Sequence, residues 1–225
     1  MGFNVAIDGP AGAGKSTVAK EIAKQEGFIY VDTGAMYRAI GLYILRKGIA
    51  LDNENEIGKI LPEIAVTLGY EDGKQQVFLN GENVSGLIRT EEVSNAASVT
   101  SQYPAVREAL LNLQHDMAKK FDVVMDGRDI GSVILPNADL KIFLTASVQV
   151  RAERRMLENR EKGIECSLEE IEKDIADRDY RDMHRAVSPL IQAEDAILVD
   201  TSYMDIEQVV SKISEMIHAK QKGRL

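Results

Sequence analysis

Residues Gly9 to Thr17, with the sequence GPAGAGKST, decide the fold of this chain. The stretch fits the pattern G-x-x-x-x-G-K-[ST], follows the apolar run from Phe3 to Ile7 and precedes a helical pattern. A loop in this context cradles phosphate groups with its backbone N–H groups, because glycines allow tight turns and close approach. The N-terminus of the following helix adds the positive end of a dipole. We therefore predict that a nucleoside triphosphate binds to Gly9, Pro10, Ala11, Gly12, Ala13, Gly14, Lys15, Ser16 and Thr17.

Two side chains of this loop are suited to the outer phosphates. Lys15 supplies a mobile positive charge, and the Ser16 hydroxyl can ligate Mg²⁺. The apolar stretch Asp122 to Met125 ends in Asp126, as does a Walker B strand, whose carboxylate holds Mg²⁺. The predicted metal ligands are therefore Ser16 and, through water, Asp126. The alternative is a glycine-rich turn with a solvated Lys15, but spacing, residue types and flanking elements all favour phosphate binding.

Composition narrows the class of protein. The 225 residues can bury one core and carry an insertion, and 44% hydrophobic with 28% charged residues is typical of a soluble globular protein. The net charge of −9 argues against nucleic-acid and anionic-membrane partners, which require a basic face. Cys166 is the lone cysteine, so we expect no disulfide framework and no cysteine metal site. Without a signal peptide or an apolar run near ~20 residues, we expect a cytoplasmic protein, and we expect a monomer.

Strand and helix patterns alternate along most of the chain, which predicts an α/β fold with a mainly parallel sheet. The predicted core strands are 4–8, 28–31, 122–125, 140–144 and 196–199. The predicted helices are 14–25, 33–46 with Asp32 or Thr33 as cap, 104–120, 147–162, 168–186 and 204–221.

The pattern changes between Ile60 and Arg89. Two short alternating runs, Val66 to Tyr70 and Gln75 to Leu79, are separated by Asp72-Gly73 and followed by Asn80-Gly81. These dipeptides are hairpin signals. The stretch favours a small antiparallel insert, and a bulged loop of the main domain is the alternative.

Arginines cluster on two predicted helices despite the acidic total. One helix carries Arg151, Arg154, Arg155 and Arg160, and the next carries Arg178, Arg181, Asp182 and Arg185 at i, i+3, i+4 and i+7. A solvated face laced with ion pairs is the ordinary reading of such a helix. Arginine suits bidentate phosphate contacts, so both faces favour a role in a triphosphate-binding protein.

No histidine shows the spacing of a metal ligand or a nucleophile partner, so His115, His184 and His218 are interpreted as structural or solvated. A phosphate acceptor would need no base, because its second pKa is about 6. Such a reaction needs neutralisation of charge, in-line positioning and exclusion of water.

Several stretches together resemble a known family. They are the loop GPAGAGKST, DTGAMYR (32–38), SGLIRTEEVSNAAS (85–98), Arg107, DGRDIG (126–131) and RDYRDMHRAVSPL (178–190). In this order, over essentially the whole chain, they resemble the bacterial cytidylate kinases, and the last two are specific to that family among nucleoside monophosphate kinases. The resemblance implies transfer of the ATP γ-phosphoryl group to CMP or dCMP with Mg²⁺. It also implies a P-loop kinase core (1–59 and 93–225), a five-stranded parallel sheet in the order 2-3-1-4-5, a monophosphate-binding insert (60–92) and a short lid (about 151–162).

The resemblance also implies roles for individual side chains. Lys15, Arg38, Arg128 and Arg185 would be catalytic. Arg38 and Arg128 would hold the acceptor phosphate, and Arg185 would lie between acceptor and donor. The cytosine ring would be contacted by Ser98, Arg107 and Asp129, and the sugar by Arg178 and Asp182. Arg151 and Arg155 would contact the ATP side. Thr33, in the CMP-binding set, stands where some members have Ser, and the hydroxyl is retained.

Two other functions stay open at this stage. A kinase for AMP, UMP or dTMP would differ around Ser98 and Asp129. A regulatory nucleotide switch that binds guanine would carry an Asn-Lys-x-Asp run, which this sequence lacks.

Overall fold

The computed structural model describes residues 2–71, 74–161 and 163–223. The chain divides into two compact units. Unit 1 comprises Met1–Gly2 and Tyr30–Phe121, and unit 2 comprises Phe3–Ile29 and Asp122–Leu225. The insert boundaries at 60 and 92 remain a prediction.

Among the described residues, five strands form the main sheet in the order β2-β6-β1-β7-β8. This is the predicted order 2-3-1-4-5, and the pairings of β1 with β6 and β7, and of β7 with β8, are parallel. The strands are β1 (Asn4–Asp8), β2 (Ile29–Asp32), β6 (Val123–Gly127), β7 (Leu140–Thr145) and β8 (Ile197–Asp200).

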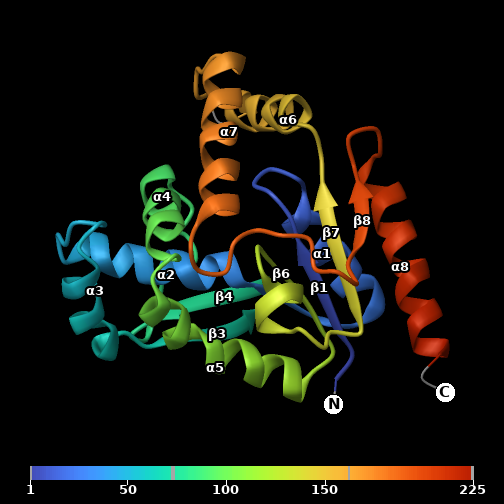
Figure 1. Cartoon of the computed structure of the whole chain (residues 1–225), viewed down its shortest axis with the longest axis horizontal. Coiled ribbons are helices and arrows are strands. Elements are labelled where there is room, and N and C mark those ends of the chain that lie inside the picture. Colours follow the sequence, from blue (N-terminus) through green and yellow to red (C-terminus); the bar gives the residue numbers. More distant parts are fainter. Residues whose placement is uncertain (1, 72–73, 162, 224–225) are drawn as a thin grey trace. The chain divides into compact units, whose positions relative to one another are not determined.

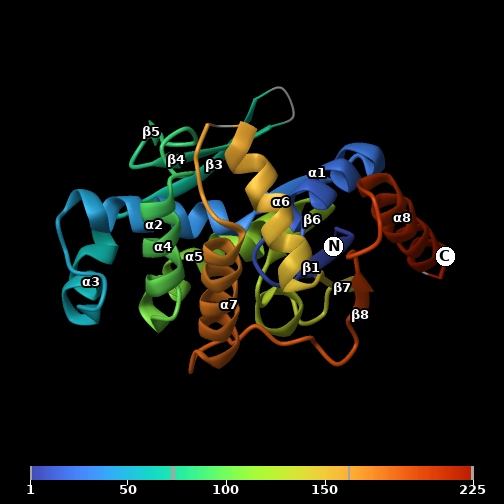
Figure 2. The same ribbon diagram turned by 90° about the horizontal axis from the view of Figure 1, so that it is seen from above.

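Apolar runs explain why the central strands lie inside unit 2. Val5, Ala6 and Ile7 of β1 are fully buried, as is typical of a parallel strand covered on both faces. Helices α1 (Lys15–Glu26) and α8 (Ile206–Lys222) pack on the same side of these strands (Figure 2). Asp8 is the register partner of Gly127, so the loops after β1 and β6 leave from the same edge of the sheet.

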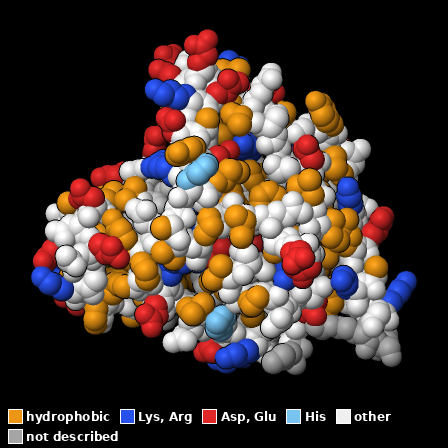
Figure 3. All heavy atoms as spheres, viewed as in Figure 1, with side chains coloured by type: hydrophobic (Ala, Val, Ile, Leu, Met, Phe, Trp, Pro, Cys, Tyr) orange, Lys and Arg blue, Asp and Glu red, His pale blue; other side chains and the backbone are white. Residues whose placement is uncertain are grey.

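Helices α6 (Val148–Glu161) and α7 (Leu168–His184) pack against each other in unit 2, with α6 lying across α7 rather than alongside it (Figure 1). Ala152, Ile171 and Ile175 make the small apolar core of this helix pair. Ser167 and Glu170 form a capping box at the start of α7, and acidic side chains gather at this end of the helix (Figure 3). Carboxylates there favour the helix, because the N-terminus is the positive end of its dipole.

Helix α7 ends at His184, two residues before the predicted end. Arg185 has extended backbone angles, and its Nε donates a hydrogen bond to the Ser188 carbonyl at 2.6 Å. Ser188 has a φ of 49°, and the Leu190 N–H bonds to the Asp182 carbonyl. The chain therefore turns back along the helix end, and Arg185 belongs to this turn rather than to the helix face.

Unit 1 contains an antiparallel sheet, as the hairpin signals predict. Its described strands are β3 (Val66–Glu71), β4 (Lys74–Leu79) and β5 (Glu82–Asn83). Asn80 and Gly81 connect β4 to β5 with positive φ, whereas the predicted turn residues Asp72 and Gly73 lie outside the described residues. A sheet of this kind excludes the bulged-loop alternative. Strand β5 is too short to leave a periodic signal in the sequence.

The antiparallel sheet packs on helix α2 (Thr33–Arg46), which Asp32 caps. The remaining elements of unit 1 are α3 (Glu54–Ile60), η1 (Leu61–Glu63), α4 (Glu91–Thr100) and α5 (Pro104–Lys120). Gly41 lets α2 and α4 approach closely, because a Cβ at this position would lie 3.0 Å from the Ala97 nitrogen. Helices α3 and α4 are absent from the sequence-based prediction.

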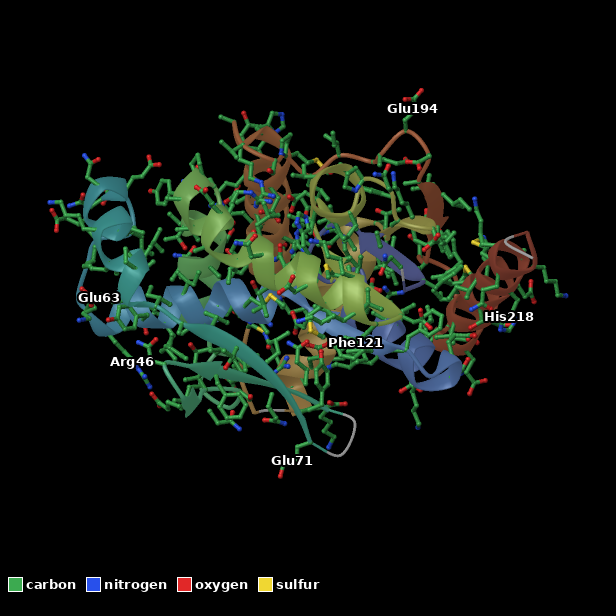
Figure 4. The ribbon with its side chains drawn as sticks, turned by 90° about the horizontal axis from the view of Figure 1, so that it is seen from below. Arg46, Glu63, Glu71, Phe121, Glu194 and His218 are labelled. Atoms are coloured by element: carbon green, nitrogen blue, oxygen red, sulfur yellow. The ribbon has the colours of Figure 1, made fainter. Side chains whose placement is uncertain are left out.

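One of the three histidines lies on the outer helix α8. His218 of α8 contacts Glu26 of α1 at 2.9 Å, a peripheral pair that agrees with a structural role for this histidine (Figure 4). Within the described ranges, no helix combines the length and apolar character needed to cross a membrane.

Candidate nucleotide-binding site

The loop between β1 and α1 has the backbone that its glycines predict. Gly9, Gly12 and Gly14 have φ values of 147°, 75° and 90°, which L residues with side chains rarely adopt. A Cβ on Gly9 would lie 1.9 Å from the Leu144 carbonyl oxygen, so no side chain fits there. The loop can therefore present its N–H groups to an anion at the start of α1.

Lys15 folds back onto this loop. Its side chain is only 6% exposed, and Nζ donates to the Pro10 carbonyl at 2.7 Å. Burial, and then the nearby Arg128, lower the pKa of Lys15 well below its usual value, although Asp126 and Asp8 oppose the shift. The interpretation of this lysine as solvated is thus wrong. A triphosphate would add negative charge beside the buried ammonium and so favour its charged form.

Ser16 and Asp126 meet where the loop and β6 end. The Ser16 hydroxyl donates to Asp126 Oδ2 at 2.9 Å, and Asp126 is buried. Both side chains present oxygen, the ligand that Mg²⁺ prefers, and a hydroxyl beside a carboxylate fits the predicted metal position. The pair is the arrangement expected from the P-loop and Walker B elements.

A second carboxylate, Asp8, joins the loop to the segment after β6. Its Oδ1 accepts the Ile130 N–H at 2.8 Å and its Oδ2 accepts the Gly131 N–H at 2.7 Å. These residues begin η2 (Ile130–Ile134), a single π-helical turn whose N-cap is Asp129. Burial is the main reason that the pKa of Asp8 is raised to about 6, with Asp129 contributing.

The DGRDIG segment and the end of α7 are joined by ion pairs. Arg128 Nε donates to Asp182 Oδ2 at 2.8 Å, and Arg185 Nη2 lies 3.5 Å from Asp129 Oδ1. Burial alone would raise the pKa of Asp182, but Arg128, Arg178 and Arg185 together hold it below its usual value. The structure thus brings five predicted residues together within unit 2: Arg128, Asp129, Arg178, Asp182 and Arg185. Arg181 differs, because its side chain is exposed and bonds to the Asp177 carbonyl.

Arg151 is bound within the chain on three sides. Its guanidinium donates to the Ala146 carbonyl at 2.9 Å, the Ala11 carbonyl of the loop at 3.0 Å and Asp179 Oδ2 at 2.6 Å. The side chain is buried, so it ties α6 and α7 to the phosphate-binding loop. Its predicted contact with ATP stays a prediction, as does that of the half-buried Arg155 one turn later.

Four of the residues predicted to bind the acceptor nucleotide lie in unit 1. Arg38 Nη2 pairs with Asp32 at 3.1 Å, and Thr33 is buried at the start of α2. Arg107 is buried, donates to the Ser101 carbonyl and lies over the Tyr37 ring at 5.7 Å. The fourth is Ser98, whose carbonyl accepts the Ser101 hydroxyl at 3.1 Å. Their predicted roles toward CMP stay predictions.

Sequence reasoning missed several residues that support these side chains. Gln75 of β4 bonds to both backbone groups of Asp32, accepting its N–H at 2.9 Å and donating to its carbonyl at 3.4 Å. Asp179 and Thr201 hold Arg151 and Arg154. Asp8 left one signal in the sequence, since it is a charged residue at the end of a buried apolar strand. No pattern indicates which partners these residues find across more than 25 positions of sequence.

Comparison with known proteins agrees with this geometry. The family described as cytidylate kinase matches residues 5–219. A cytidylate kinase from Ligilactobacillus salivarius (strain UCC118) is 49% identical over 97% of this chain and 97% of its own. Another, from Desulfitobacterium hafniense (strain Y51), is 53% identical over 97% of this chain and 94% of its own.

A solved structure agrees at the level of the fold. An uncharacterized protein from Eubacterium ventriosum ATCC 27560 has a TM-score of 0.53 and 12% identity, and the match covers 96% of this chain and 98% of that one. At this identity the likeness shows the fold alone. The family match, which spans almost the whole chain and includes the loop, DGRDIG and α7, shows more: this chain belongs to the cytidylate kinase family.

Proposed function

We propose that the chain transfers the γ-phosphoryl group of ATP to CMP or dCMP, giving ADP and CDP or dCDP. The observation that carries this proposal is one cluster in unit 2. There the phosphate-binding loop, with Lys15, lies in the same compact unit as the paired arginines Arg128 and Arg185. Membership in the cytidylate kinase family supports the choice of acceptor.

On the donor side, the loop Gly9 to Thr17 holds the phosphates through its N–H groups, and Lys15 exchanges the Pro10 carbonyl for a phosphate oxygen. Ser16 and Asp126 would hold Mg²⁺. When bound, the ion neutralises phosphate charge and orients the β- and γ-phosphates. Arg155 extends positive charge along α6.

On the acceptor side, no general base is needed. The second pKa of a phosphate monoester is about 6, so the attacking oxygen is already deprotonated at neutral pH. The protein has to position it in line and to neutralise charge that spreads over the transferring group. We assign this work to Arg38, Arg128 and Arg185. Asp182 holds Arg128 in place through their 2.8 Å bond.

The same proposal assigns the remaining predicted residues. Asp129, with Ser98 and Arg107, faces cytosine, and an ionised carboxylate selects cytosine because it can accept only from the exocyclic amine. Arg178 and Asp182 face the sugar, and 60–92 forms the monophosphate-binding insert. We also propose that the chain is a monomer and that it is located in the cytoplasm; its single cysteine, which leaves no disulfide framework, supports the proposed location.

A coupled ADP-release assay tests the function directly. With ATP and Mg²⁺ fixed, CMP, dCMP, UMP, AMP and dTMP are compared as acceptors. We expect the highest kcat/KM with CMP or dCMP and almost no ADP release without acceptor. A preference for AMP or dTMP would assign the chain to another monophosphate. ADP release that is independent of every acceptor would contradict a kinase function altogether.

A further inference from the structure

The first N–H groups of η2 are capped from outside the helix. Asp8, in β1, accepts hydrogen bonds from both Ile130 and Gly131, at 2.8 and 2.7 Å, across more than 120 positions of sequence. The Asp8 side chain is 5% exposed, so both bonds are shielded from water. Each carboxylate oxygen serves one N–H group, which leaves these two donors satisfied.

The residue that ordinarily does this work is the N-cap itself. Aspartate is among the preferred N-cap residues, because its carboxylate accepts the exposed N–H groups of the first turn. Asp129 occupies the N-cap position of η2 but makes no capping bond. Its carboxylate lies instead toward Arg185 Nη2, at 3.5 Å. The contacts of Asp8 thus explain why an aspartate at a capping position turns away from the helix that follows it.

We infer that Asp8 is a positioning residue for base selection: by capping η2 in place of Asp129, it keeps the Asp129 carboxylate turned away from the η2 N–H groups, in the orientation from which the proposed function has it read the nucleobase. The inference rests on the proposed function, in which Asp129 reads cytosine. It assigns Asp8 no contact with substrate. Asp8 directly precedes Gly9. The residue that positions Asp129 is therefore at the end of the strand that leads into the phosphate-binding loop.

A purely structural Asp8 makes a different prediction. If it served only to hold β1 and η2 together, its loss would lower activity with every acceptor alike. If it controls the orientation of Asp129, its loss lowers the preference for CMP over UMP in particular. The ratio of the two kcat/KM values therefore separates the two roles, because general damage to the fold cancels in it.

The test is Asp8→Asn, made both in the natural chain and together with Asp129→Asn. The amide keeps one acceptor but presents an NH₂ group to the second N–H, which Asp129 can then cap. We expect the CMP-to-UMP ratio to fall roughly fivefold to tenfold, the equivalent of one capping bond. In the Asp129→Asn background, Asp8→Asn should leave the ratio unchanged, since the residue through which it acts is gone.

Asp205→Asn is the matched control. Asp205 caps α8 by accepting the Gln208 N–H at 2.8 Å, so the same chemical change is made at a helix with no link to Asp129. We expect it to leave the ratio as it is in the natural chain. Equal losses for CMP and UMP in Asp8→Asn, or the same fall of the ratio in both backgrounds, would overturn the inference.

Two further measurements cover the other outcomes. Amide exchange at Ile130 and Gly131 should be slow in the natural chain and faster at one of them in Asp8→Asn, which tests the cap even if CMP proves not to be the substrate. If Asp8→Asn does not fold, a crystal structure of the natural chain with CMP decides. Asp8 should cap η2 while Asp129 contacts the exocyclic amine, and an Asp129 carboxylate bonded to the η2 amides would overturn the inference. An unselective natural chain would contradict the proposed function instead.

Discussion

Two buried charges at the ends of the phosphate-binding loop titrate in unusual ranges. Burial lowers the pKa of Lys15 and raises that of Asp8 to about 6, so in both cases the neutral form is favoured. Each charge is stabilised mainly by a group of opposite sign or by N–H donors. These two residues are therefore where substitution and pH should have the clearest effects.

Replacement of Lys15 by methionine should cut turnover by about 10²–10³, the usual loss for one preorganised electrostatic donor. Methionine keeps most of the buried volume, so the melting temperature should change little. ADP release with CMP and thermal unfolding measure the two effects. Near-normal turnover would mean that the reacting triphosphate does not lie on this loop.

The raised pKa of Asp8 predicts a pH-dependent stability. A carboxyl whose pKa is about 6 in the folded chain and 3.8 ordinarily binds its proton more tightly when folded. The contribution of Asp8 to the free energy of unfolding is therefore fully present below pH ~4 and is lost as pH rises through ~6. The loss is roughly 3 kcal/mol at about 1.4 kcal/mol per pH unit.

Urea unfolding of the natural chain and of Asp8→Asn, at pH 4.5 and 7.5, checks this expectation. The free energy of unfolding of the natural chain should fall relative to that of the variant as pH increases. A difference between the two proteins that is independent of pH would show that the Asp8 carboxyl has an ordinary pKa.

At the scale of elements, side chains of the β3–β4 hairpin form hydrogen bonds with the backbone of β2 in unit 1. Gln75 holds both backbone groups of Asp32, and the Tyr70 hydroxyl donates to the Tyr30 carbonyl at 3.1 Å. Asp32 in turn caps α2 and pairs with Arg38. The hairpin therefore fixes the backbone from which Arg38 reaches the proposed acceptor phosphate.

Gln75→Ala should raise the KM for CMP several-fold and leave that for ATP unchanged, because a lost hydrogen bond to a partly buried backbone group costs about 1 kcal/mol. Gln76→Ala is the control, since Gln76 accepts a hydrogen bond from Asn83 of β5 and has no bond to Asp32 among those of the described residues. Steady-state kinetics with each substrate varied in turn measures both. Equal effects of the two variants would argue against this role of Gln75.

Long periodic elements could be predicted from the sequence, but irregular ones could not. Helix α5 begins at Pro104 and ends at Lys120 as predicted, because proline and a regular apolar face define it. Strand β5 and the π-turn η2 have no period to detect. The turn at Arg185 depends on the bond from Arg185 to the Ser188 carbonyl and on the bond from the Leu190 N–H to the Asp182 carbonyl, which no local propensity encodes.

The same distinction holds for the candidate site. Gly9 to Thr17 could be predicted because a backbone conformation requires glycine at fixed spacing. The burial of Lys15, by contrast, follows from packing and from its bond to Pro10. The pairing of Gln75 with Asp32, and that of Asp8 with η2, are set by the tertiary fold. The sequence of either partner alone does not indicate the other.

For the whole molecule, the proposed reaction requires that water be kept from ATP. We expect residues 151–161 and the described parts of 60–92 to close over the nucleotides. Hydrogen exchange with a non-hydrolysable ATP analogue plus CMP should show new protection in both segments, and the analogue alone should protect fewer residues. Exchange that is unchanged in both segments would contradict closure.

The anchoring of Arg151 sets the mechanics of such a motion. Its bonds to Ala11 and Ala146 pin the first turn of α6, while Asp179 pins α7 to the same point. Helix α6 would thus act as a lever that pivots at Arg151, and the displacement of each residue would grow with its distance from this pivot. At about 1.5 Å per residue, Arg155 sits near the pivot and Arg160 about twice as far out. A small rotation about Arg151 would therefore move Arg160 about twice as far as Arg155 and leave the phosphate-binding loop still.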